Sequence, residues 1–174
     1  MLSRTHAAVG AAIGCGAAHL LGGPNPLLAS SLIIGSTIGS ISLDIDTIHS
    51  KVSRSNIATL SISFLIEEIF GHRGIIHTPL FIGLLCSLEA ILLYTYRNSD
   101  LGILLFIGFF GIAFILGAIS HLILDMLTPM GVMLLYPVSK KRFVIPNPMV
   151  KGMSRFEYII FSSFVLVDIA LFLL

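Results

Sequence analysis

The stretch LGILLFIGFFGIAFILGAISHLILDM, residues 101–126, decides the fold. A mostly apolar run of this length is typical of a transmembrane helix. Near its end, His121 and Asp125 lie four positions apart, so a helix places both on one face. A neutral imidazole and a carboxylate in that arrangement can bind one divalent metal ion from a single rigid element. Ionisable groups at membrane depth are costly, and they therefore indicate a partner, a cavity or a pathway.

Composition agrees with a membrane protein. Hydrophobic residues make up 56% of the chain, charged residues 11%, and the mean hydropathy is +1.00. A soluble domain carries about a quarter charged residues. The 174 residues are enough for one domain, so we expect residues 1–174 to form a single integral-membrane domain. A net charge of +1 gives no reason to expect nucleic acid as a partner. Cys15 and Cys86 lie in apolar runs and are expected to be buried thiols.

The apolar segments predict an all-α, polytopic helix bundle with about four to five transmembrane helices. They cover residues 7–21, 27–43, 78–96, 101–126 and 156–174. Residues 57–70 are too short to span easily, so we expect a short helix in the membrane interface. The first segment is rich in Ala and Gly, which suits a retained helix better than a signal peptide.

Basic residues predict the orientation of the bundle. With the N-terminus in the cytoplasm, nine of the ten Lys and Arg residues fall in inner segments and Arg97 alone falls outside. The same topology brings potential metal ligands from four segments to the inner face: His6, Asp44, Asp46, His72, His77, His121 and Asp125. We therefore expect an inner (plasma) membrane protein with its N-terminus and its metal site on the cytoplasmic side.

The chemistry of these residues points to zinc, or to manganese or magnesium. Seven imidazole and carboxylate ligands are enough for two or three ions. Two ions can hold a water molecule and stabilise the attacking and leaving oxygens of a displacement. Asp46 is the candidate base, and Arg73 could stabilise a phosphate or a developing anion. Asp44 and Asp46 could share an ion only if the backbone is extended or turned, because positions i and i+2 of a helix diverge.

Each candidate also has a structural explanation. An aspartate after a helix often forms a cap or a turn, and a single histidine such as His6 is often a packing group. His121 and Asp125 could form a simple hydrogen-bonded pair. Arg73 could be an ordinary inner-face charge. The remaining polar residues are assigned structural, interfacial or lipid-headgroup roles: His19, His49, Glu67, Glu68, Lys140, Lys141 and Arg142.

Three motifs together resemble a known family. They are Gly71-His72-Arg73-Gly74-x-x-His77, Asp44-Ile45-Asp46 and Ser120-His121-x-x-x-Asp125-x-x-Thr128-Pro129-x-Gly131. With Thr5-His6 and Tyr136-Pro137, they resemble the YdjM-like inner-membrane metal-dependent hydrolases. The resemblance runs from about His6 to the final helix.

This resemblance implies a helical core distantly related to zinc-dependent phospholipase C and P1-type nucleases, which cleave phosphoesters. The ligands that it implies are His6, Asp44, Asp46, His72, His77, His121 and Asp125. The chain departs from the family pattern at Leu43, where proline is usual, and at Thr47, where histidine is common. Ile76 and Thr78 also replace the usual residues around His77. None of these changes removes an implied ligand.

The leading interpretation is a membrane-embedded, zinc-type hydrolase of phosphoesters, with membrane lipids around it and a lipid, lipid-linked or small-molecule phosphoester as its substrate. An alternative is a non-enzymatic scaffold or regulatory protein with a structural metal site. Metal transport fits less well, because transporters place their sites near the bilayer midplane. The oligomeric state does not follow from the sequence.

Overall fold

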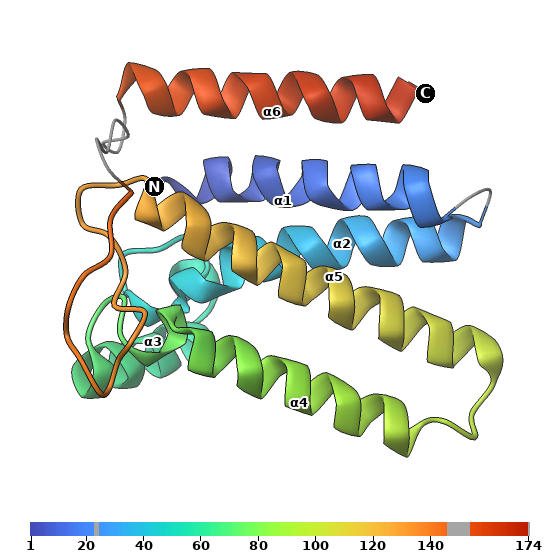
Figure 1. The fold of residues 1–174 in the computed structure, drawn as a ribbon, viewed down its shortest axis with the longest axis horizontal. Coiled ribbons are helices and arrows are strands. Elements are labelled where there is room, and N and C mark those ends of the chain that lie inside the picture. Colours follow the sequence, from blue (N-terminus) through green and yellow to red (C-terminus); the bar gives the residue numbers. More distant parts are fainter. Residues whose placement is uncertain (23–24, 146–153, 174) are drawn as a thin grey trace.

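The computed structural model describes residues 1–22, 25–145 and 154–173, and these residues confirm the predicted all-α class (Figure 1). Short 3-10 segments cover Leu43–Asp46, Ser53–Ser55 and Ile75–His77. The six described α-helices are α1 (Ser3–Ala17), α2 (Pro26–Ser42), α3 (Ile57–Phe70), α4 (Pro79–Thr95), α5 (Leu101–Met126) and α6 (Arg155–Leu173).

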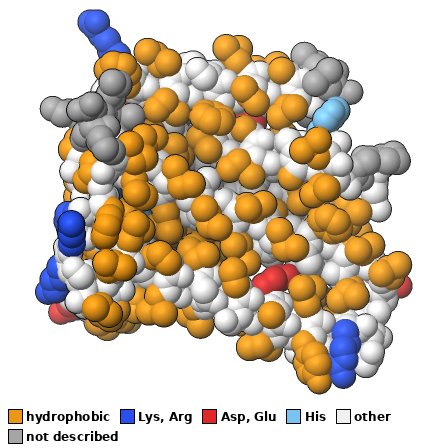
Figure 2. Space-filling model, in the orientation of Figure 1, with side chains coloured by type: hydrophobic (Ala, Val, Ile, Leu, Met, Phe, Trp, Pro, Cys, Tyr) orange, Lys and Arg blue, Asp and Glu red, His pale blue; other side chains and the backbone are white. Residues whose placement is uncertain are grey.

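Two of the described helices are long and apolar enough to cross a membrane. They are α5 and the segment Pro26–Asp46, which is α2 with its following turn. α4 is a shorter apolar helix and buries none of its residues. Its leucines at 80, 84 and 88 are 60%, 62% and 51% exposed. Figure 2 shows apolar side chains spread over most of the visible face, with Lys and Arg at its edges and acidic atoms visible at a few places within it.

Small residues let α1, α2 and α5 pack closely. The Ser36 hydroxyl on α2 donates to the Gly10 carbonyl on α1 at 2.7 Å. A Cβ atom at Gly117 on α5 would overlap the Ser36 carbonyl oxygen. Glycine and serine allow this approach between helix backbones in a membrane. As a result, the start of α1 and the ends of α2 and α5 meet at one end of the molecule (Figure 1).

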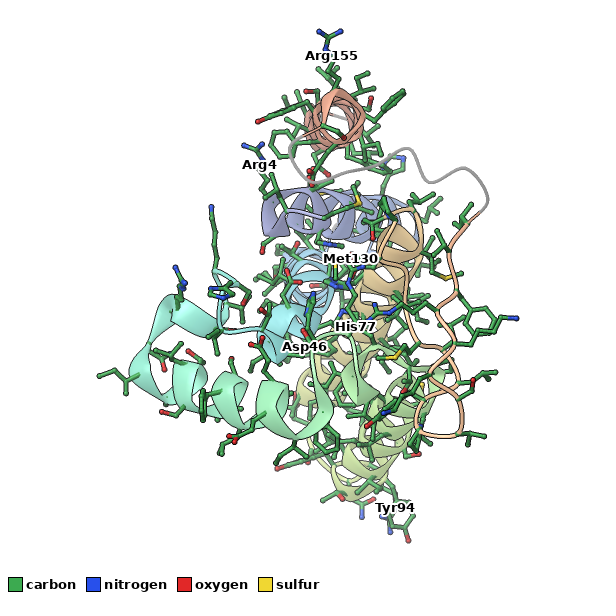
Figure 3. The ribbon with its side chains drawn as sticks, turned by 90° about the vertical axis from the view of Figure 1, so that its left-hand side faces the viewer. Arg4, Asp46, His77, Tyr94, Met130 and Arg155 are labelled. Carbon is green, nitrogen blue, oxygen red and sulfur yellow. The ribbon has the colours of Figure 1, made fainter. Side chains whose placement is uncertain are left out.

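α3 runs across the other helices. In Figure 3 α6 is viewed down its axis, whereas α3 is seen along its length. Asn56 and Thr59 form a capping box at the start of α3. Ser63 faces inward and donates to the Ser53 hydroxyl at 2.7 Å, while Ile57 and Ile69 are 84% and 66% exposed.

α6 packs on α1, and the start of α6 contacts the start of α1. The Glu157 carboxylate is buried and accepts hydrogen bonds from the Leu2 backbone N–H at 2.5 Å and from the Thr5 hydroxyl at 3.2 Å. This contact holds the first residues of the chain in place.

Candidate metal centre

His6 is fully buried by the packing of α1 against α2. The Ser40 hydroxyl donates to the His6 backbone carbonyl at 2.5 Å and fixes the first turn of α1. Both ring nitrogens of His6 are buried without a hydrogen-bond partner among the described residues. An unpaired buried polar atom costs about 1–3 kcal/mol, so this ring is suited to a ligand that lies outside the polypeptide.

The 3-10 turn after α2 directs its two carboxylates to different neighbours. Asp44 Oδ1 lies 3.7 Å from His121 Nε2, and Asp44 Oδ2 accepts a hydrogen bond from the Ser3 hydroxyl at 2.9 Å. Asp46 is 1% exposed and contacts the loop that follows α3. The turn that sequence reasoning required is therefore present, but it separates the two aspartates.

The loop after α3 carries two histidines and an arginine into the site. Gly71 and Arg73 have φ values of 72° and 59°, in the left-handed region. The Arg73 backbone N–H donates to Asp46 Oδ2 at 2.6 Å. The Nδ1 atoms of His72 and His77 lie 3.0 Å and 2.9 Å from Asp46 Oδ1 and Oδ2. Asp46 thus uses both oxygens to position this loop and its histidines.

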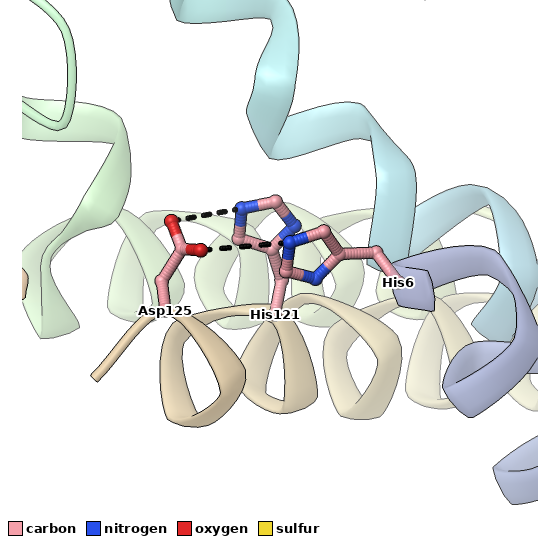
Figure 4. Close-up of side chains that lie close together, drawn as sticks. All are labelled: His6, His121 and Asp125. Atoms are coloured by element: carbon pink, nitrogen blue, oxygen red, sulfur yellow. Dashed lines mark ion pairs between the residues drawn. The ribbon is translucent and has the colours of Figure 1, made fainter. Parts of the chain in front are cut away.

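α5 contributes His121 and Asp125 from adjacent turns of one face (Figure 4). His121 Nε2 lies 3.6 Å from Asp125 Oδ2, and His6 Nε2 lies 3.5 Å from Asp125 Oδ1. The rings of His6 and His121 stack with their centroids 3.8 Å apart. These three buried residues offer ligand atoms that all lie within 4.8 Å of one another, close enough to hold a metal ion.

The Nε2 atoms of His77 and His121 lie 3.1 Å apart and are closed to solvent. His121 Nδ1 lies 2.6 Å from the Ser40 carbonyl oxygen, which can only accept, so we assign the proton to Nδ1. Asp46 favours the same tautomer of His77. Burial lowers the pKa of His77, and Asp46 opposes this shift only in part. A cation between the two Nε2 atoms could be bound by the lone pairs of both rings in their neutral forms.

The spacing of the donor atoms fits a zinc-type ion. His77 Nε2, His121 Nε2 and Asp125 Oδ2 form a triangle with sides of 3.1, 3.6 and 3.6 Å. Ligand atoms around a tetrahedral zinc ion with bonds of about 2.1 Å lie about 3.4 Å apart. Asp44 and His6 are available to complete the coordination. Asp46 contacts His77 at Nδ1 and the Ser40 carbonyl contacts His121 at Nδ1, and such contacts commonly orient metal-binding imidazoles.

Asp125 is also held by positive charge from its other side. Arg73 is 4% exposed, and its Nη2 lies 2.8 Å from Asp125 Oδ1. Its Nη1 donates to the Thr128 hydroxyl at 2.9 Å and to the Gly131 carbonyl at 3.0 Å. The Met1 amino group lies 3.1 Å from the same Asp125 oxygen. Arg73 therefore orients Asp125, a candidate metal ligand. The sequence predicts that Arg73 stabilises a phosphate, and it does not predict this contact.

A cavity of about 530 Å³ opens beside the centre, at the end of the molecule that faces the viewer in Figure 3. Asp44 and Arg73 belong both to the centre and to the cavity wall, and the partly exposed His72 borders it. The remaining lining residues are Met1, Leu2, Ser3, Arg4, Thr47, His49, Ser50, Lys51 and Tyr158.

The structure brings all seven predicted ligands into one network, in which each has an N–O or N–N contact of 3.7 Å or less with another. They are His6, Asp44, Asp46, His72, His77, His121 and Asp125. The polar residues assigned other roles lie apart from this network. Glu68 and His19 are exposed, the Glu67 carboxylate accepts the Ile48 N–H at 2.7 Å, and His49 Nδ1 pairs with Arg54.

Sequence reasoning missed three supporting residues. The Ser40 carbonyl fixes His121, but a backbone group leaves no signal in the sequence. Thr128 was quoted only as part of a motif. Glu157 was overlooked, although a single acid in the first turn of an apolar helix is a signal that a buried partner is needed.

A family model described as "YdjM inner membrane protein" matches residues 1–172, which include every residue of the centre and the cavity. No curated protein and no solved structure matches the chain.

Proposed function

The chain belongs to the YdjM inner membrane protein family, and on that premise we propose that it is a membrane-embedded, metal-dependent hydrolase of phosphoesters. The observation that carries this proposal is the buried His77–His121–Asp125 triangle, which adjoins a cavity through Asp44. A ligand set that opens into a cavity is typical of catalytic metal sites.

Zinc is the ion that the donor set and its spacing favour. In this assignment His77, His121 and Asp125 would hold the ion, and a position on the side of Asp44 and the cavity would stay open for water or substrate. A second ion, as the expected two or three ions require, would need Asp46 and His72 to exchange their mutual contact for bonds to the metal. When bound, the metal would polarise the phosphoryl oxygen and activate water.

The protein residues have separate tasks in the proposed reaction. Asp44 lies between the centre and the cavity, so its carboxylate is placed to accept a proton from the attacking water. Asp46 is the base that the sequence suggested, but its two oxygens contact His72, His77 and the Arg73 N–H, so we assign it a positioning role. Arg73 holds Asp125 in position and lines the cavity beside it.

We also propose the finer topology. α1, α2, α4, α5 and α6 would be the transmembrane helices, α3 would lie in the interface, and the site would face the cytoplasm. The positive-inside charge distribution supports this orientation. The buried His and Asp cluster in an all-α setting supports the proposed relation to phospholipase C and P1-type nucleases.

The test combines metal analysis with turnover. Purified wild type should retain zinc after dialysis and release phosphate or an alcohol from a phosphoester panel such as phosphatidate and bis(p-nitrophenyl) phosphate. His121→Ala and Asp125→Ala should lose both properties, and His19→Ala, at an exposed position, should keep both. Zinc retained by the double variant would refute the site, and zinc without turnover would refute the enzyme.

A structural metal site in a membrane scaffold is the second candidate. The complete burial of His6, His77 and His121 favours it, because structural zinc sites are closed to solvent. In that case, removal of zinc would lower the unfolding temperature, and wild type would turn over no member of the panel.

A further inference from the structure

The cavity beside the centre is larger than one phosphoryl group requires. Its volume of about 530 Å³ lies in the range of roughly 300–1,000 Å³ that is typical of small-molecule sites. Asp44, His72 and Arg73 line it next to the centre. Residues 1–4, Thr47 and residues 49–51 also line it, and Tyr158 of α6 contributes to its border.

Two of the cations that line the cavity are exposed and come from different segments of the chain. Arg4 belongs to the first turn of α1, and Lys51 belongs to the loop after α2. Both are exposed, and neither forms an ion pair with a carboxylate in the part of the chain that the structure describes. Arg4 lies over the rings of Tyr158 and Phe161 at 4.8 Å and 5.4 Å (Figure 3 labels Arg4).

Arg4 and Lys51 differ from Arg73, the cation next to the centre, in having no carboxylate partner among the described residues. The Arg73 guanidinium is compensated by Asp125 at 2.8 Å. Arg4 and Lys51 remain as positive charges beside the cavity, so a ligand that reaches the centre passes a positive field. A ligand with one phosphoryl group at the centre would leave both charges without a counter-charge.

We infer that the preferred substrate is a diphosphate monoester, with its terminal phosphoryl group at the centre and its second phosphate between Arg4 and Lys51. This inference rests on the proposed function and names its substrate class. From the centre to the opening, the order would be terminal phosphate, bridging oxygen, inner phosphate and organic group.

The reaction balances with water alone. Water adds to the terminal phosphorus, and the bond from that phosphorus to the bridging oxygen breaks. The bridging oxygen and its electron pair stay with the monophosphate ester, and inorganic phosphate leaves. The proton lost by water passes through Asp44 to solvent, so no oxidant, reductant or second substrate is needed.

The first test measures binding without turnover. Purified, zinc-loaded protein is titrated with methylenediphosphonate and with methylphosphonate, and its zinc content is measured after each titration. We expect the diphosphonate to bind at least about tenfold more tightly, and Lys51→Gln to remove most of that difference. Lys51→Arg should restore it, and Lys141→Gln, a basic residue that does not line the cavity, should not change it. Equal affinity of wild type for both ligands would overturn the inference.

The second test measures selectivity in turnover. We expect kcat/KM for farnesyl diphosphate to exceed that for farnesyl monophosphate about tenfold, with the ratio falling toward one in Lys51→Gln through KM. Isopentenyl diphosphate, measured in parallel, shows whether the enzyme prefers a soluble diphosphate or one attached to a long lipid chain. Turnover of monophosphates with no diphosphate preference would refute this inference alone, whereas a zinc-free, inactive wild type would refute the proposed function.

Discussion

His77 Nε2 and His121 Nε2 lie 3.1 Å apart, although the residues are separated by 43 positions of chain that include all of α4. One ring comes from a loop and the other from α5, and each is oriented through its Nδ1 atom, by Asp46 and by the Ser40 carbonyl. The two Nε2 atoms therefore meet because both outer contacts are in place.

The first prediction concerns Asp46→Asn. An asparagine can no longer act as a charged acceptor for His77 and His72, so we expect zinc affinity to fall about 10–100-fold without being abolished. Competition with a fluorescent chelator measures the affinity. Glu68→Gln, which removes an exposed carboxylate outside the centre, should bind zinc as wild type does. Complete loss of zinc in a folded Asp46→Asn protein would instead make Asp46 a direct ligand.

The second prediction concerns Arg73→Gln. The change leaves the Asp125 carboxylate buried without its closest cation and removes the bonds to Thr128 and Gly131. Breaking a buried ion pair in this way costs about 3–5 kcal/mol. The free energy of unfolding, measured by denaturant titration in detergent, should fall by this amount, and Arg97→Gln, at an exposed position, should change it little. An unchanged value for Arg73→Gln would contradict the ion pair.

The third prediction concerns pH. Burial lowers the pKa of His77 in the folded protein, whereas the unfolded chain takes up this proton near the ordinary value of about 6.5. The unfolded state then binds more protons, so the apoprotein should lose stability as pH falls below about 6.5. Unfolding temperatures between pH 8 and pH 5.5 measure this. His77→Gln should make the profile less steep, and an equally steep profile in that variant would assign the effect elsewhere.

The fourth prediction concerns helix packing. Gly117→Ala places a methyl group against the Ser36 carbonyl oxygen, so α2 and α5 must separate. Gly83→Ala is a matched control, because a Cβ atom at that α4 position meets no heavy atom within 4 Å. We expect a lower unfolding temperature and less bound zinc for Gly117→Ala only. Similar behaviour of the two variants would contradict the close packing.

The fifth prediction concerns orientation. In a background of Cys15→Ala and Cys86→Ala, single cysteines are introduced as Arg97→Cys and Lys141→Cys. A membrane-impermeant maleimide applied to intact cells should label position 97, and should label position 141 only after permeabilisation. The reverse pattern would place the cavity on the outer side.

Much of the fold follows from periodicity and length. Residues 57–70 and 101–126 were predicted with the bounds that α3 and α5 have, because apolar runs end at polar or turn residues. α1 begins at Ser3, four residues before the prediction, because Ser3 and Thr5 are held by Asp44 and Glu157 from distant elements. Such long-range contacts leave no local pattern.

The sequence predicted which residues belong to the candidate site, but not how they contact one another. Residue types and the predicted topology placed the seven ligands at the inner face of the membrane. They could not tell that Asp46 lies behind His77, or that Arg73 turns toward Asp125, because both depend on the left-handed backbone at Arg73. The sequence likewise gave no reason to single out Lys51.

α3 contributes no ligand, yet in the proposed topology, where it lies in the membrane interface, it would set the depth of the centre in the bilayer. Its exposed apolar side chains would bind it to the level of the lipid headgroups. Ser63 bonds to Ser53, and the Ser53 hydroxyl also lies 3.5 Å from the Asp44 carbonyl oxygen. A change in headgroup packing or bilayer thickness that moves α3 would thus displace the turn that carries Asp44, so lateral pressure in the membrane would act directly on the geometry of the centre.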